Sequence, residues 1–390
     1  MVETTSSFWT APAQLLVAGS LFLLLYVYVL YPLLLAAIAC LFRKRQPLPG
    51  YEPTLSVLIC AYNEADGIAE KLNHTLELDY PADKLEILVV SDGSTDDTEA
   101  IVGRFSDPRI RLLRSSRRLG KTNAQNEGVR QCNGEVIVFS DATAKYQKDA
   151  LKFLAANYQD PTVGAVSGRY QYFDEHGMSP SGAGSILFWS YENNIKSLQS
   201  RISTITGCCG CIYSVRRSAF TELPADIISD LVQPLKIIQQ RFKVVFEDRA
   251  LAYEATTMSS EQEWTMRVRV ITRAMRGILS VRELLNPLKY GWVSFQLLSH
   301  KVLRWFVPFY LLGLLIGSAL LLHDARFLPL FVLQGMFYAL ALSSLAVPVH
   351  RYFKLLGLPL YFCILNLAAL MSLMQLIRGR NYTVWETVRR

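Results

Sequence analysis

Hydrophobic residues divide this chain into an apolar N-terminal segment, a mixed central region and a largely apolar C-terminal region. Residues 15–41 are almost free of charge and are long enough to cross a bilayer as one helix. We predict an N-terminal transmembrane helix in residues 1–46, a soluble domain in 47–280, an interfacial amphipathic segment in 281–301, transmembrane segments in 302–377 and a basic tail in 378–390. The candidate C-terminal membrane segments are 302–322, 327–347 and 355–377.

Short apolar runs alternate with helical patterns at the start of the central region. The runs are residues 54–60, 85–90, 110–113 and 136–139, and each is bounded by polar turns. Such runs are typical of buried parallel strands, and strand–helix alternation is typical of an α/β sheet. The sequence therefore predicts a doubly wound, mostly parallel sheet.

The rest of the central region predicts further elements of the same domain. Strands are expected in 163–168, in 202–215 around a turn, and in 243–246; helices are expected in 186–198, 227–241 and 262–279. The glycine-rich stretch 170–185 is predicted to be mostly loop.

Basic residues predict the orientation of the chain in the membrane. Arg43, Lys44 and Arg45 directly follow the first apolar segment, so the positive-inside rule places the central domain in the cytoplasm. This predicts a multi-pass protein of the inner (plasma) membrane. Three C-terminal crossings would put the tail outside, whereas its basic residues favour the inside, so one of the three segments could be re-entrant or interfacial.

The overall charge is +7, with 40 basic and 33 acidic residues. The basic residues are scattered and gather mainly beside the apolar helices, which favours membrane lipids and phosphorylated substrates as partners, and no nucleic acid. The hydrophobic content of 51% and the mean hydropathy of +0.21 are high for a purely soluble protein. The seven cysteines form no spaced framework, and Cys208, Cys209 and Cys211 lack zinc-site spacing, so a structural role is expected for them.

Two aspartates directly follow predicted strands. Asp92 comes after 85–90 and Asp141 after 136–139, and open α/β sheets bind ligands at the carboxyl ends of their strands. Asp92 could accept hydrogen bonds from a base or ribose, or it could cap a helix. Asp141 could join a magnesium or manganese ion to a diphosphate, or it could be a turn residue.

A third aspartate and two groups of basic residues complete the candidate site. Asp230 opens a predicted helix, where it could be a general base of raised pKa or a carboxylate favoured by the helix dipole. Arg267 and Arg269 lie on a basic helix that could bind a diphosphate or lipid headgroups. Lys121 follows Gly120 at a helix start, which is a weak phosphate signal by itself.

Taken together, these segments resemble the family 2 inverting glycosyltransferases of membranes, the group of cellulose, chitin, hyaluronan and poly-N-acetylglucosamine synthases. The resemblance covers about residues 54–276. The motifs that carry it are Ser56-Val-Leu-Ile-Cys-Ala-Tyr-Asn-Glu64, Val89-Val-Ser-Asp-Gly-Ser-Thr-Asp96, Gly120-Lys-Thr-Asn-Ala-Gln-Asn126, Phe139-Ser-Asp-Ala142, Gly207-Cys-Cys-Gly210 and Ser229-Asp230.

The resemblance implies a GT-A-type fold and a set of roles. The nucleotide of a UDP-sugar donor would be held by Ala61, Tyr62, Glu64, Asp92 and Lys121. The metal and diphosphate site would contain Asp141 and Thr143, with Mg or Mn as the cofactor, and Arg267 or Arg269 would stabilise the departing diphosphate. Gly207, Cys208, Cys209 and Gly210 would support a glycan or lipid-linked acceptor, and Asp230 would deprotonate its hydroxyl.

The sequence departs from the family pattern in two places. Thr143 stands where the family often has the second aspartate of Asp-x-Asp, which puts the metal position in doubt. Met266-Arg-Val-Arg-Val270 stands where the synthases have the Gln-x-x-Arg-Trp motif. The addition of a few sugars to a lipid or a short glycan is therefore as plausible an activity as the synthesis of a long polymer.

Two further alternatives remain at this point. The acceptor could be a polyprenyl phosphate, which needs no general base. The chain could instead be a membrane channel or scaffold with a degenerate domain, although its apolar segments contain almost no ionisable residues. About four membrane helices could line a narrow pore only together with the soluble domain or with a second copy of the chain. A homo-oligomer is therefore possible.

Overall fold

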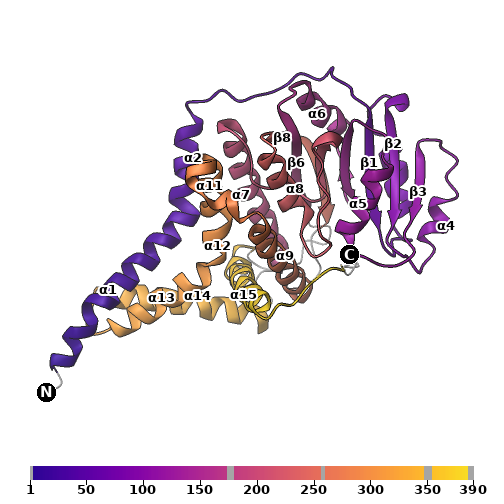
Figure 1. Cartoon of the computed structure of the whole chain (residues 1–390). Coiled ribbons are helices and arrows are strands. Elements are labelled where there is room, and N and C mark those ends of the chain that lie inside the picture. The colour runs from indigo at the N-terminus through magenta and orange to yellow at the C-terminus, as the bar shows by residue number, and fades with distance from the viewer. Residues whose placement is uncertain (1–2, 174–179, 256–259, 347–353, 385–390) are drawn as a thin grey trace.

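The computed structural model describes residues 3–173, 180–255, 260–346 and 354–384. An α/β domain lies on one side of the molecule, and long apolar helices extend away from it on the other (Figure 1). The N-terminal helix runs into the apolar layer, and the connection that follows α2 returns over the α/β domain to its first strand (Figure 1).

Eight strands form a single mixed sheet. They are β1 (Leu55–Ala61), β2 (Leu85–Ser91), β3 (Ile110–Arg114), β4 (Val136–Asp141), β5 (Lys145–Tyr146), β6 (Val163–Phe173), β7 (Ile212–Arg216) and β8 (Lys243–Ala255). Their spatial order is β3-β2-β1-β4-β7-β6-β8-β5. Strands β3, β2, β1 and β4 are parallel, and so are β6 and β8, whereas β7 and β5 are antiparallel to their neighbours. The predicted mostly parallel α/β sheet is confirmed.

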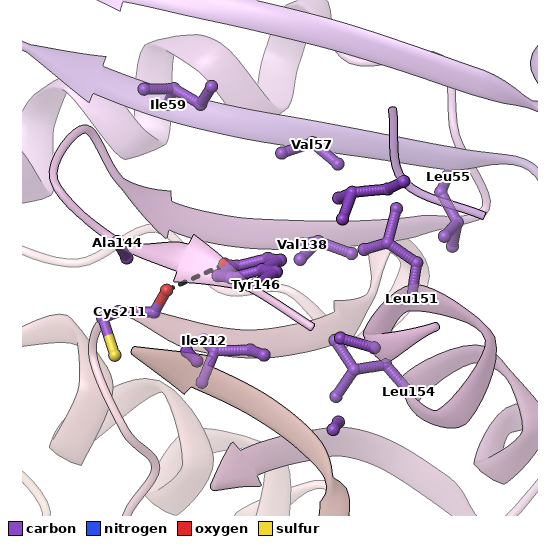
Figure 2. Close-up of a cluster of buried hydrophobic side chains, with 14 of the residues drawn as sticks. Leu55, Val57, Ile59, Val138, Ala144, Tyr146, Leu151, Leu154, Cys211 and Ile212 are labelled. Carbon is purple, nitrogen blue, oxygen red and sulfur yellow. Dashed lines mark hydrogen bonds between the residues drawn. The ribbon is translucent and has the colours of Figure 1, made fainter. Parts of the chain in front are cut away.

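Alternate residues of the central strands enter two separate cores, because successive side chains of a strand point to opposite faces of the sheet. Val57 and Ile59 of β1 belong to one core, and Leu58 belongs to the other. Figure 2 shows the first core, where the Tyr146 hydroxyl donates a 2.8 Å hydrogen bond to the Cys211 carbonyl. Both faces of β1 are buried, which explains its continuous apolar run.

Helices cover both faces of the sheet. The first core is covered by α3 (Ile68–Leu76), α4 (Thr98–Val102) and α6 (Ala150–Ala156), and the second by α5 (Lys121–Gln131), α8 (Ser229–Gln239) and α9 (Ser260–Ser280). The long helix α7 (Pro180–Ile202) lies beside β6 and β8 and joins this domain to the apolar helices.

The apolar helices are α1 (Glu3–Leu25), α2 (Tyr31–Ala39), α10 (Pro287–Tyr290), α11 (Trp292–Leu297), α12 (Leu303–Trp305), α13 (Val307–Leu320), α14 (Leu328–Ala346) and α15 (Leu358–Ile377). By length and composition, the stretches Thr10–Ala39, Leu328–Leu345 and Leu358–Ile377 could each cross a membrane. The pair Trp292–Trp305 and Val307–Leu320 is bent by 57° and could count as a fourth span or as a re-entrant loop.

Three predicted elements differ from the structure. Residues 302–322 do not form one straight helix, because Pro308 near the start of α13 cannot continue the hydrogen bonding of the preceding turn. Residues 170–173 belong to β6 and 180–185 to α7, so much of the predicted loop is regular structure; residues 174–179 lie outside the described part. Residues 246–255 continue β8 well beyond its predicted end.

Candidate active site

A cavity of about 420 Å³ opens where the carboxyl ends of β1 and β4 meet the N-termini of α5 and α8. Most of the predicted site residues line it: Glu64, Lys121, Asp141, Thr143, Gly207, Cys208, Gly210, Asp230, Arg267 and Arg269. Ala61, Tyr62, Asp92 and Cys209 are not among the lining residues. One cavity therefore brings together chemistry from six separate segments.

Asp230 lies in the first turn of α8 and faces this cavity. Its Oδ1 atom is shielded from solvent and has no hydrogen-bond partner among the described residues. Its Oδ2 atom lies so close to the Gly210 backbone that a Cβ there would be only 2.7 Å away. Burial raises the pKa of Asp230, although Lys121 and Lys196 partly oppose this effect. These features fit a carboxylate that can accept a proton.

The loop containing Cys208 is fixed beside this aspartate. The Cys208 N–H donates a 2.8 Å hydrogen bond to the Asp230 carbonyl, and the Cys209 N–H donates a 2.9 Å hydrogen bond to Ser167 Oγ. Cys208, Cys209 and Cys211 are all buried and form no disulfide in the part of the chain that the structure describes, and their structural role stays a prediction.

Lys121 and Asp141, which both line the cavity, form an ion pair. Lys121 is the first residue of α5, and Asp141 is the last residue of β4. Burial disfavours the lysine charge, but the attraction of Asp141 outweighs it and raises the pKa of Lys121. A charged lysine at a helix N-terminus is suited to bind phosphate oxygens.

Glu254 of β8 supplies a carboxylate next to the position where the sequence lacks one. The Thr143 hydroxyl donates a 2.6 Å hydrogen bond to Glu254 Oε1, and the Tyr170 hydroxyl donates to Glu254 Oε2. Glu254 and Asp141 both line the cavity. The sequence gives no local signal for this arrangement, because Glu254 is more than 100 residues from Thr143.

The residues of the cavity fit a metal ion only if the phosphates of a bound sugar nucleotide supply further ligands. No group of three or more His, Cys, Asp or Glu side chains in the described part of the chain is arranged to hold a metal by itself. A magnesium-type ion often takes one or two protein carboxylates and completes its shell with substrate phosphates and water. Asp141 and Glu254 are the carboxylates that could serve in this way.

Asp92 is fully buried below the cavity. Its two carboxylate oxygens accept hydrogen bonds from the N–H groups of Leu119 (2.8 Å) and Gly120 (2.9 Å). Burial raises the pKa of Asp92 despite these two donors. Asp92 thus positions the loop that leads into α5, and its predicted nucleotide contact stays a prediction.

The loops after β1 and β2 hold each other in place. Asn63 has a positive φ of 52°, and its Oδ1 accepts a 2.8 Å hydrogen bond from the Thr95 N–H. Asp96 accepts hydrogen bonds from the N–H groups of Ala65 and Thr98, so it caps this loop. The guanidinium of Arg118 lies 3.7 Å from the ring centroid of Tyr62, which is one of the predicted nucleotide-binding residues.

Three arginines of α9 border the cavity. Arg267 Nε donates a 2.7 Å hydrogen bond to Glu263, and its Nη2 donates a 3.0 Å bond to the Tyr361 hydroxyl. Arg273 Nη2 binds the Ile227 carbonyl (2.7 Å) and Thr122 Oγ1 (2.9 Å), which ties α9 to the N-termini of α5 and α8. Burial, with the repulsion of Arg269, lowers the pKa of Arg273 to about 10.

Several lining residues were not predicted from the sequence: Tyr170, Tyr172, Trp189, Glu192, Lys196, Glu254, Lys301 and Trp305. Glu192 and Lys196 are four residues apart on α7, so they share one face of that helix. The four-residue spacing can be seen in the sequence, but nothing in the sequence shows that this face of α7 lines the cavity.

Comparisons with known proteins agree with this geometry. Residues 56–223 match the sequence profile of the family described as Glycosyl transferase family 2. A poly-beta-1,6-N-acetyl-D-glucosamine synthase of Staphylococcus epidermidis is 28% identical over 223 residues, which are 55% of this chain and 53% of that protein. An N-acetylglucosaminyltransferase of Rhizobium meliloti is 31% identical over 176 residues, 44% of this chain and 41% of that protein.

A solved structure shares the fold over almost the whole chain. It is a mannosyltransferase from Pyrobaculum calidifontis in complex with GDP-Man and Mn²⁺, with a TM-score of 0.72 and 23% identity. The alignment covers 95% of this chain and 99% of that one. The sheet and its helices thus form a GT-A-type fold.

Residues 56–223 match the glycosyltransferase family 2 profile, and the solved structure shows that the fold is shared. The chain is similar to the membrane synthase group of that family, and it spans about half the length of the curated relatives that it matches.

Proposed function

We propose that this protein is an inverting glycosyltransferase that moves a sugar from a UDP-sugar to a hydroxyl group of a glycan or glycolipid. The main support is Asp230, a carboxylate with an unpartnered oxygen that lines the same cavity as Lys121 and Asp141. A hydroxyl acceptor must lose a proton during attack, and a carboxylate of raised pKa is suited to take it.

The proposed step balances as a single displacement. The acceptor oxygen forms a bond to the anomeric carbon while the bond from that carbon to the diphosphate oxygen breaks. The electron pair of the broken bond leaves with UDP, and the hydroxyl proton moves to Asp230. Attack opposite to the leaving group inverts the stereochemistry of the anomeric carbon.

Two cationic residues of the cavity would face the leaving group. Lys121, at the N-terminus of α5, and Arg269 line the same cavity and would stabilise the negative charge on the departing diphosphate. Asp141 and Glu254 would hold a Mg²⁺ or Mn²⁺ ion against the donor, which would neutralise phosphate charge. The Mn²⁺ of the Pyrobaculum mannosyltransferase supports the choice of a divalent ion.

Two of the relatives are named for N-acetylglucosamine, which supports an N-acetylated amino sugar as the transferred group. The apolar helices support synthesis at a membrane, and Arg43, Lys44 and Arg45 support a cytoplasmic catalytic domain of the inner (plasma) membrane.

Replacement of Asp230 by Asn tests the proposal. We expect Asp230→Asn to lower the transfer rate by about 10²–10⁴-fold, because the amide cannot take the proton. UDP-sugar binding, measured by calorimetry, should change little. Asp226→Asn is the matched control, since Asp226 pairs with Arg276 and does not line the cavity.

Full transfer activity of Asp230→Asn would contradict the assignment of the base. It would favour a phosphate acceptor such as a polyprenyl phosphate, which needs no deprotonation. A failure of every UDP-sugar to bind the wild-type protein would contradict the donor.

A further inference from the structure

A second cavity, of about 470 Å³, lies between the catalytic domain and the apolar helices. Its walls come from the first candidate membrane span, from α7, from the bent stretch Trp292–Trp305 and from α15. More than half of its eighteen lining residues are apolar or aromatic, and among them are Leu187, Ile271, Leu358, Phe362 and Leu365. Such a wall suits a hydrocarbon chain better than the hydroxyl groups of a glycan.

The two cavities adjoin each other. Six residues line both of them: Phe188, Glu192, Arg267, Ile271, Lys301 and Trp305. The second cavity therefore borders the cavity that contains Asp230.

Buried charges lie at the junction. Glu192 Oε2 is 3.2 Å from Lys301 Nζ, and Glu192 Oε1 pairs with Arg304 Nη1 and lies 3.1 Å from His300 Nε2. One carboxylate thus faces two cations, and the group has an excess of positive charge. An unbalanced charge at this depth is costly unless a ligand completes it.

Arg304 still has unused donors. Its Nε and Nη2 atoms are shielded from solvent and have no hydrogen-bond partner among the residues that the structure describes. The rings of Tyr191 and Tyr28 flank its guanidinium, with centroids 5.4 Å and 5.9 Å away. A guanidinium with free adjacent N–H groups is suited to bind phosphate oxygens with two hydrogen bonds.

We propose that the second cavity binds the acceptor, and that this acceptor is a lipid-linked sugar with a phosphate between its apolar chain and its sugar. The chain occupies the apolar cavity, the phosphate lies at Arg304 and Lys301, and the sugar hydroxyl reaches Asp230. This inference rests on the proposed function, because it identifies the acceptor of the same reaction. The bond changes of the transfer stay the same.

The first experiment varies the length of the acceptor chain. Full-length protein in nanodiscs is given a UDP-sugar and an isoprenoid phosphate that carries one sugar, with either a long or a ten-carbon chain. We expect kcat/KM to fall by about fourfold for each methylene removed from the buried part of the chain. Equal kcat/KM values for the two lipids and for a free oligosaccharide would overturn the proposal, while transfer to any of them would leave the proposed function intact.

A pair of variants tests the position of the chain. Ala369 lines the second cavity and is almost fully buried, whereas Leu367 on the same helix is 54% exposed and points away. Ala369→Phe fills the cavity and should lower the long-to-short ratio of kcat/KM at least tenfold, and Leu367→Phe should leave this ratio unchanged. Equal effects of the two variants would overturn the assignment of the cavity.

A binding experiment does not depend on turnover. A photoreactive long-chain isoprenoid phosphate should label peptides of α7 and α15, and Arg304→Gln should reduce this labelling at least tenfold. Glu192 keeps Lys301 and His300 as partners in that variant. Labelling spread over the outer surfaces of α1 and α14, or equal competition by phosphatidylglycerol, would show a structural lipid only and would overturn the proposal.

Transfer to the isoprenoid phosphate that carries no sugar would bear on both proposals. That result would support a lipid phosphate in the second cavity, but it would contradict the hydroxyl acceptor of the proposed function and the sugar-bearing acceptor inferred here. If no UDP-sugar is turned over but photolabelling is specific, the proposed function is contradicted and the lipid site is still supported.

Discussion

Asp230 is held by contacts that leave one buried carboxylate oxygen without a hydrogen-bond partner. The Gly210 backbone lies beside Oδ2, where no larger residue fits without displacement, and Oδ1 has no partner among the described residues. Lys121 and Lys196 lower the pKa of Asp230, and burial raises it by more. The balance between these neighbours should set the pH at which the carboxylate can accept a proton.

The pH dependence of transfer should report this balance. Only the deprotonated carboxylate is a base, so activity should be lost as the pH falls, with a midpoint above the value of about 4 for an ordinary aspartate. Lys196→Met removes a neighbouring cation and should move this midpoint to higher pH. A kcat/KM profile from pH 4 to 8 measures both effects, and an unmoved midpoint in Lys196→Met would contradict the assignment.

Lys71 carries a separate pH effect that concerns stability. Its ammonium is buried against the Ala144 carbonyl, 4.6 Å from the ring centroid of Tyr146, and burial lowers its pKa to about 8. Between pH 8 and the ordinary lysine value, the unfolded chain binds the extra proton. Lys71 should therefore contribute an increase of about 3 kcal/mol at most to the free energy of unfolding across this interval. Thermal unfolding of wild type and Lys71→Met in detergent at several pH values isolates this contribution, because the stability difference between the two proteins should change with pH in favour of wild type.

The central residues of the site could be predicted because they follow strands and open helices. Lys121, Asp141 and Asp230 lie at such positions, and all three line one cavity. Glu254 and Lys301 could not be predicted in the same way, since long-range packing alone brings β8 and the bent helical stretch to that cavity. Asp92 has the expected position, but its carboxylate is already used by Leu119 and Gly120.

Among the helices, α5 depends on close approach to the sheet. A Cβ at Gly128 would lie 2.2 Å from Leu58 Cδ1 and 2.9 Å from Val90 Cγ2, both in the buried core. Gly128→Leu should therefore destabilise the domain by about 1–3 kcal/mol through overpacking. Gln131→Leu, on an exposed position of the same helix, should change stability by no more than about 0.5 kcal/mol. Thermal unfolding compares the two, and equal stability of both variants would contradict this packing.

The parallel half of the sheet was predictable at the level of elements, because its strands are short, apolar and separated by helices. The other half of the sheet was harder: β6 and β8 extend into stretches with polar and charged residues such as Arg169 and Glu254, which give no apolar run. The N-terminal half of α7 is rich in glycine and serine, and packing beside β6 and α15 overrides its weak helix propensity.

At the scale of the whole molecule, the position of the segment after α15 indicates on which side of the membrane the tail lies. It runs back toward α5 (Figure 1). A Cβ at Gly120 would lie 2.0 Å from the Thr383 carbonyl oxygen, and Arg276 Nη2 donates a 3.2 Å hydrogen bond to the Arg380 carbonyl. The tail therefore contacts the catalytic domain. An odd number of crossings after that domain would prevent this contact.

The packing of α13 and α15 indicates which segments cross. Gly313 lies against Leu16 and Ser20, and Gly317 lies against Ala13 and Val17, so α13 runs antiparallel to α1. In contrast, α15 packs along α9, where Ser372 Oγ donates a 3.0 Å hydrogen bond to the Val268 carbonyl. We propose that α13 and α14 cross the membrane as a pair and that α15 lies against the catalytic domain without a net crossing.

Cysteine labelling in sealed vesicles tests this topology. With Cys40 replaced by Ser, single cysteines are introduced at Leu48, Arg326 and Arg380, which are exposed positions. An impermeant maleimide should label Leu48→Cys and Arg380→Cys from the same side, because both positions are on the side of the catalytic domain. Arg326→Cys, in the turn between α13 and α14, should react only from the opposite side. If Arg380→Cys reacted together with Arg326→Cys, α15 would be a true crossing and the contact between the tail and Gly120 could not exist in the membrane.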